Sequence, residues 1–111
     1  MNITKVKIFV TIPVGKTDEI REAICNAGAG TIGTNYKDCS TTIKCIGTFR
    51  PINNANPYIG EKERLEFVEE EKLEVICEVS KVKEVIKVLR NIHPYEEPAI
   101  DIVPLLDESD F

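Results

Sequence analysis

Two hydrophobic periodicities alternate along this chain, and their order constrains the fold more than any other feature. Apolar and polar side chains alternate, or nearly so, in four segments, which is typical of half-buried strands: residues 3–12, 39–50, 63–79 and 99–104. Apolar side chains three and four residues apart predict two amphipathic helices: residues 17–27 and 81–92. The predicted order is therefore strand, helix, strand, strand, helix, strand.

This order predicts a ferredoxin-like α+β sandwich. Each strand–helix–strand unit makes a right-handed crossover. The split arrangement then gives a four-stranded antiparallel sheet with both helices on one face. A chain of 111 residues is the size of one domain. We predict a single domain over residues 1–104, followed by an acidic tail over residues 105–111.

Three local features carry more specific predictions. Thr17 and Ser80 stand at the starts of the two predicted helices, where their hydroxyls are suited to capping. The acidic run Glu69–Glu71 interrupts the third strand pattern, which predicts a solvated bend or bulge there. Pro94 ends the second helix, because proline disfavours helical geometry in the residue before it.

Charge and composition exclude some classes of partner. The formal net charge of −5 argues against a nucleic-acid partner, which needs a basic surface. No apolar run is long enough to span a membrane, and no signal-peptide pattern opens the chain. We therefore predict a soluble cytoplasmic protein. The four cysteines form no C-x-x-C pair and are expected to be reduced, although the role of Cys39 stays open.

The segment "GAGTIG", residues 28–33, matches the G-x-G-x-x-G dinucleotide fingerprint letter for letter. That fingerprint needs a strand before it and a helix after it, so that the helix start meets the pyrophosphate. Here a predicted helix precedes it and an extended segment follows. We therefore interpret it as a glycine-rich loop and not as a nucleotide site.

The segment "NIHPYEEPAIDI", residues 91–102, supplies the candidate site. It contains His93, the only histidine, together with Tyr95, Glu96 and Glu97. Its prolines favour a structural corner, whereas an imidazole followed by two carboxylates could also orient a ligand or share a divalent metal. The predicted topology adds Lys16 and Arg50 to the same edge of the sheet. A closed zinc site would need a further ligand, and no cofactor motif is evident.

Four blocks of the sequence resemble a known family: "NAGAGTIGTNYKDCS", "GTFRPINNANPYIGE", "LEFVEEEKLEVIC" and "HPYEEPAIDIVPL". In this order they are similar to the PII-like and CutA-like accessory domain of the Nif-three-like family, named for an NGG-one-interacting factor. The resemblance implies a stand-alone copy with a ferredoxin-like fold, and an oligomer, since trimers are common among CutA and PII proteins. The family's dinuclear metal site belongs to its main domain, so its hydrolase activity does not carry over.

These observations favour a non-enzymatic, oligomeric binding or regulatory module. We expect a homo-oligomer, with a trimer favoured over a dimer, a small-molecule ligand near His93, and neither nucleic acid nor membrane as partner. The alternative is a protein that handles divalent metal through the segment His93–Glu97. Enzymatic use of Glu96 or Glu97 as a base has less support, because no nucleophile–base spacing or second histidine accompanies them.

Overall fold

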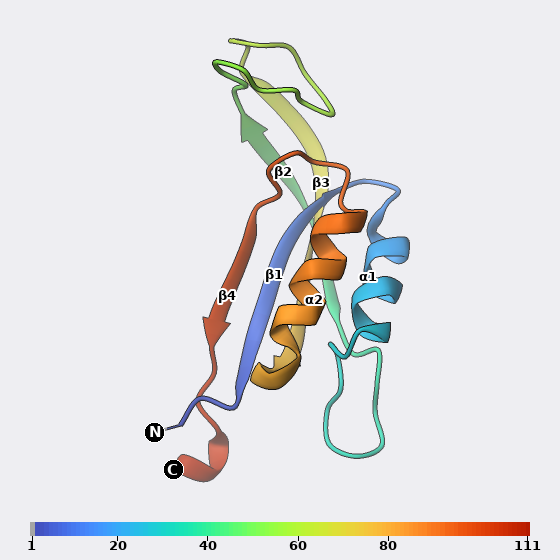
Figure 1. Ribbon diagram of the computed structural model, residues 1–111, viewed down its shortest axis with the longest axis vertical. Coiled ribbons are helices and arrows are strands. Elements are labelled where there is room, and N and C mark those ends of the chain that lie inside the picture. The colour runs from blue at the N-terminus through green and yellow to red at the C-terminus, as the bar shows by residue number, and fades with distance from the viewer. Residues whose placement is uncertain (1) are drawn as a thin grey trace.

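A computed structural model describes residues 2–111 and shows a four-stranded antiparallel sheet with order β2-β3-β1-β4. Both helices cover one face of this sheet (Figure 1). The elements are, in order, β1 (Lys5–Pro13), α1 (Thr17–Asn26), β2 (Thr41–Phe49), β3 (Glu66–Glu78), α2 (Val79–Ile92), β4 (Ile100–Pro104) and a short 3-10 helix, η1 (Glu108–Asp110). The predicted ferredoxin-like fold is confirmed.

The core lies between the central strands and the two helices. Strand alternation turns one face of β1 and β3 inward, and the apolar stripes of α1 and α2 cover it. Ile8 and Ile12 of β1 are fully buried, as are Ile24 of α1 and Leu89 of α2. Each such side chain contributes about 1.5–3 kcal/mol relative to an exposed one. This packing fixes the relative positions of the strand ends that carry the site.

Strands β2 and β3 form a hairpin arm that extends beyond β1. Strand β3 pairs with β1 from Glu70 to Glu78, whereas its pairing with β2 begins four residues earlier, at Glu66. The end of the arm and the loop that joins its strands therefore project past the sheet (Figure 1). That loop and the segment between α2 and β4 lie at the same end of the molecule. The glycine-rich loop lies at the opposite end.

The prediction of a bend or bulge at the acidic run is wrong. Glu70 and Glu71 each have a partner on both sides, in β1 and in β2, and the register has no skipped residue. Hydroxyl groups from other elements stabilise these carboxylates inside the sheet. Tyr95 donates to Glu70 at 2.6 Å, and Thr17 donates to Glu71 at 2.7 Å.

Both predicted helix caps are also wrong. Helix α1 begins at Thr17 with Lys16 as the N-cap, and the Thr17 hydroxyl is used by Glu71 instead. Helix α2 begins at Val79, so Ser80 lies inside its first turn. Strand β3 runs directly into α2, and the Val79 N–H donates to the carbonyl of Thr4 at 2.9 Å. Tertiary contacts thus replace the local caps.

The predicted acidic tail over residues 105–111 contains the short helix η1. Asp107 caps it, accepting a hydrogen bond from the Ser109 N–H at 2.9 Å. No helix within residues 2–111 is long and apolar enough to cross a membrane.

Candidate functional site

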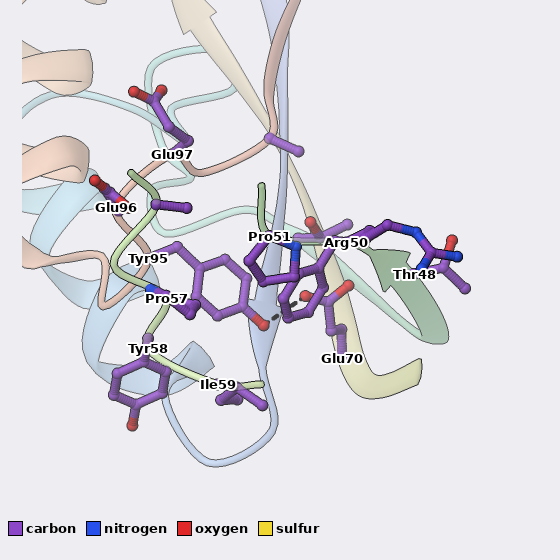
Figure 2. Close-up of a pocket in the computed structure, with 14 residues that line it drawn as sticks. Thr48, Arg50, Pro51, Pro57, Tyr58, Ile59, Glu70, Tyr95, Glu96 and Glu97 are labelled. Atoms are coloured by element: carbon purple, nitrogen blue, oxygen red, sulfur yellow. Dashed lines mark hydrogen bonds between the residues drawn. The ribbon is translucent and has the colours of Figure 1, made fainter. Parts of the chain in front are cut away.

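A cavity of about 290 Å³ lies where the β2–β3 loop meets the segment after α2 (Figure 2). Its walls come from strands β1, β2 and β3 and from both connecting segments. Most of the lining is apolar, and the charged or phenolic groups come from two tyrosines, three glutamates and one arginine. The lining residues are Thr11, Thr48, Phe49, Arg50, Pro51, Ala55, Pro57, Tyr58, Ile59, Glu70, Tyr95, Glu96, Glu97 and Ala99.

A hydrogen bond between Tyr95 and Glu70 forms the polar centre of this cavity (Figure 2). The Tyr95 hydroxyl donates to Glu70 Oε2 at 2.6 Å, and Glu70 is only 6% exposed. Gly47 of β2 leaves room for this carboxylate, since a Cβ atom at position 47 would overlap Glu70 Oε1. A buried acidic side chain is therefore fixed by a tyrosine from a distant segment and by a glycine on the neighbouring strand.

The Tyr95 phenol stays protonated over the ordinary pH range. Burial is the main effect that raises its pKa well above the usual value, and the hydrogen bond to Glu70 adds to it. The neutral phenol is the form that can donate to a carboxylate. Tyr95 is thus a hydrogen-bond donor here and not a base.

His93 supports Tyr95 from behind the cavity. Its Nε2–H donates to the carbonyl of Thr11 at 2.8 Å, and its Nδ1 accepts the Tyr95 N–H at 3.1 Å. Strand β4 pairs with β1 only as far as Val10. The imidazole therefore bonds the carbonyl of the next residue of β1, Thr11, which lies beyond the pairing with β4. Burial lowers the pKa of His93 and outweighs the opposing effects of the Thr11 carbonyl and Glu70. The neutral ring, which this arrangement requires, is therefore favoured.

The rim of the cavity joins the two connecting segments. Glu96 Oε2 accepts the Asn56 N–H at 2.8 Å, and the rings of Tyr58 and Tyr95 lie with their centroids 6.1 Å apart. Arg50 stands on the other side, and its guanidinium donates to the carbonyl of Glu63 at 2.9 Å. Figure 2 shows Glu96 and Glu97 on one side of Tyr95 and the Arg50 guanidinium directed away from the Tyr95–Glu70 pair.

The structure brings four of the six predicted site residues into this cavity. Tyr95, Glu96, Glu97 and Arg50 line it. His93 lies behind the wall, and Lys16 is exposed at the start of α1 outside the lining. Among residues 2–111, no three His, Cys, Asp or Glu side chains come together in an arrangement that could hold a metal ion.

Sequence reasoning missed Glu70 and Tyr58. Glu70 was assigned to a solvated bend, although it is the buried acid of the cavity. One signal was available: Gly47 lies within a strand pattern, and a strand glycine often marks a close approach by another group. Tyr58 carried no comparable signal in its turn-rich segment.

Comparison with known sequences places this chain beside one segment of longer proteins. It is 45% identical over 104 residues to the GTP cyclohydrolase 1 type 2 homolog of Halalkalibacterium halodurans, covering 94% of this chain and 28% of that protein. The homolog of the same name from Bacillus subtilis is 42% identical over 99 residues, covering 89% and 26%. The chain thus spans only about a quarter of the length of these relatives. No protein-family model matches it.

Solved structures agree with this placement. A Bacillus cereus protein related to NIF3 superposes with a TM-score of 0.80 at 39% identity, covering 95% of this chain and 26% of that one. CutA1 from Shewanella sp. SIB1 superposes with a TM-score of 0.71 at 15% identity, covering 96% and 86%. The fold is therefore that of a CutA-like ferredoxin-like domain. In sequence, the chain is a homologue of one segment of NIF3-related proteins, which confirms the predicted resemblance.

Proposed function

We propose that this protein is a non-enzymatic binding or regulatory module whose small-molecule ligand occupies the cavity around Tyr95 and Glu70. One observation carries the proposal: a buried carboxylate is fixed by a hydrogen bond inside a cavity whose walls are mostly apolar. Mostly apolar walls with a few convergent polar groups are typical of ligand sites. The cavity's volume of about 290 Å³ suits a small compound.

Binding is favoured over turnover by the state of the polar groups. The raised pKa of Tyr95 keeps its proton on the phenol, so it is a poor base. Both nitrogens of His93 already make hydrogen bonds within the protein, which leaves neither for proton transfer in this arrangement. The names of the longer relatives describe proteins about four times as long, so we extend no activity from them.

A ligand screen by thermal unfolding tests this proposal. The panel should contain nucleotides, amines, organic acids and divalent ions, with Tyr95→Phe and Tyr36→Phe as matched variants. Tyr36 is exposed and forms a β-bridge with Ile32 of the distant glycine-rich loop, so its variant should respond as the wild type does. A ligand at 100 times its dissociation constant stabilises the folded state by about 2.7 kcal/mol. The proposal would be contradicted if no compound raised the unfolding temperature, or if Tyr95→Phe and Tyr36→Phe responded alike.

The alternative proposal is a divalent-metal-handling protein. Solved structures of the same fold include one titled divalent cation tolerance protein, from Thermus thermophilus, at 15% identity, which shares the fold alone. In this chain Glu96 and Glu97 would supply the carboxylate ligands, because both nitrogens of His93 are already hydrogen-bonded. Metal analysis of protein purified without an affinity tag tests it. A content far below one ion per three chains would rule the alternative out.

We further propose that the protein forms a homo-oligomer, with a trimer favoured and a dimer as the alternative. Strands β2 and β4 are sheet edges with unpaired backbone groups. Ile46 and Phe67 are 69% and 68% exposed on one face of the arm, where β3 has passed the end of β1. Exposed apolar groups beside a free edge support contact with a second copy.

Light scattering at micromolar concentration tests the assembly. We expect a mass above that of one chain, and a smaller mass for Phe67→Glu. Phe111→Glu is the matched control, because Phe111 is 89% exposed but lies at the chain end outside the arm. A wild-type protein that is monomeric at this concentration would contradict the proposal.

A further inference from the structure

We infer that the cavity binds a small organic cation, an ammonium or guanidinium group carried on an apolar body. This inference rests on the proposed ligand-binding function and names the chemical class of the ligand. Three observations support it: the negative charge of the lining, the burial of Glu70 without a cationic partner, and the two tyrosine rings in the cavity wall.

The cavity lining carries more negative than positive charge. Three carboxylates line it, Glu70, Glu96 and Glu97, against a single guanidinium, that of Arg50, which gives a formal charge of −2. The guanidinium is held at the rim by the Glu63 carbonyl and points away from Glu70 (Figure 2). Tyr95 is protonated and contributes no charge. A ligand of opposite sign is thus favoured, and a phosphate or dicarboxylate would meet like charge.

Glu70 supplies a specific anchor for such a cation. It is only 6% exposed, and no Lys, Arg or His side chain within the described chain forms an ion pair with it. Its Oε2 accepts the Tyr95 hydroxyl, whereas its Oε1 accepts no hydrogen bond from any side chain of residues 2–111. Burying a carboxylate without a cation costs several kcal/mol. A ligand N–H that reaches Oε1 would offset part of this cost.

The remaining walls suit the body of an organic ligand better than a bare metal ion. The tilted rings of Tyr58 and Tyr95 line one side of the cavity, and the faces of such rings attract organic cations. Pro51, Pro57 and Ile59 continue the apolar surface. A divalent ion needs about six oxygen ligands, which these side chains do not supply. An alkyl or aryl group attached to the cation would instead bury apolar area against them.

Calorimetric titrations with three compounds of one shape test the inference: phenethylamine, its neutral analogue 2-phenylethanol, and phenylacetate as the anion. We expect phenethylamine to bind at least about tenfold more tightly than the alcohol, since a charge-assisted hydrogen bond is stronger than one between neutral groups. Glu70→Gln should abolish this preference. Glu69→Gln should keep it, because Glu69 lies on the opposite face of the same strand, is exposed and is not among the lining residues.

Salt provides a second measurement that needs no variant. The affinity for phenethylamine should fall as salt rises, whereas that for the alcohol should not. Equal or tighter binding of the alcohol or phenylacetate would overturn the inference and leave the proposed binding function standing. Failure of all three compounds to bind at millimolar concentration would also overturn it. The proposed function itself fails if no compound of the wider thermal screen raises the unfolding temperature, or if Tyr95→Phe and Tyr36→Phe respond to the binding compounds alike.

Discussion

Replacing His93 by alanine is expected to lower the free energy of unfolding by about 2–4 kcal/mol, since a buried unsatisfied polar group and a small cavity each cost on this order. The imidazole bonds the Thr11 carbonyl and the Tyr95 N–H, and the alanine leaves both without a partner. Because these groups belong to β1 and to the segment after α2, the loss also frees Tyr95 from its position in the cavity.

Urea unfolding of wild type, His93→Ala and His93→Gln measures this effect. Glutamine can still donate to the Thr11 carbonyl, so it should restore part of the lost stability. A role for His93 in metal binding alone predicts a different result: metal-free wild type and His93→Ala would be equally stable. Equal stability would contradict the structural role described here.

The same histidine should contribute to loss of stability in mild acid. Burial lowers its pKa in the folded state below the unfolded value of about 6.5. The unfolded chain therefore binds the proton first as pH falls, and the folded state loses stability from about pH 6.5 downward. The wild type should lose more stability than His93→Gln between about pH 7 and pH 5. Parallel pH profiles for the two proteins would contradict this.

Replacing Gly47 by alanine should have the second largest effect. It should lower ligand affinity more than it lowers the stability of the fold. The new Cβ would overlap the Glu70 carboxylate, which must move away from Tyr95. Overall stability should change by only about 1 kcal/mol, since the displaced group is the end of a flexible side chain and alanine is less costly than glycine in a strand. Ligand affinity should fall as much as in Glu70→Gln.

The ionisation of Tyr95 reports this displacement directly. Its pKa is raised by burial and by the bond to Glu70, so loss of the bond should bring the pKa closer to the ordinary value of about 10. NMR titration of labelled tyrosine rings measures it in Gly47→Ala. Thr42→Ala is the control, because Thr42 pairs with Leu73 on the other face of the sheet. An unchanged Tyr95 pKa in Gly47→Ala would show that Glu70 had not moved.

The sequence predicted the fold well because hydrophobic periodicity indicates which face of each helix or strand is buried. Val6, Ile8 and Val10 alternate with half-buried neighbours, so the strand could be recognised without knowing what it packs against. Element order then left few topologies. Topology alone predicts Arg50 and Tyr95 at the same edge of the sheet, because this needs only the direction of each strand, and both residues line the cavity.

The helix caps and the buried acid could not be predicted, because their partners are distant in the sequence. Thr17 is suited to capping, but Glu71, 54 residues away, takes its hydroxyl. Glu70 is bonded by Tyr95, 25 residues later, and His93 bonds a carbonyl 82 residues earlier. An acidic triplet is usually solvated, so local pattern favoured the wrong interpretation. Only the folded structure shows that Glu70 is the buried carboxylate of this triplet.

An amide NMR titration of isotope-labelled protein with phenethylamine shows where a ligand binds. We expect the largest shifts on lining residues with backbone amides, such as Thr48, Arg50, Ile59, Glu70 and Ala99. Shifts centred on the glycine-rich loop at residues 28–33, or no shifts at millimolar ligand, would contradict this expectation.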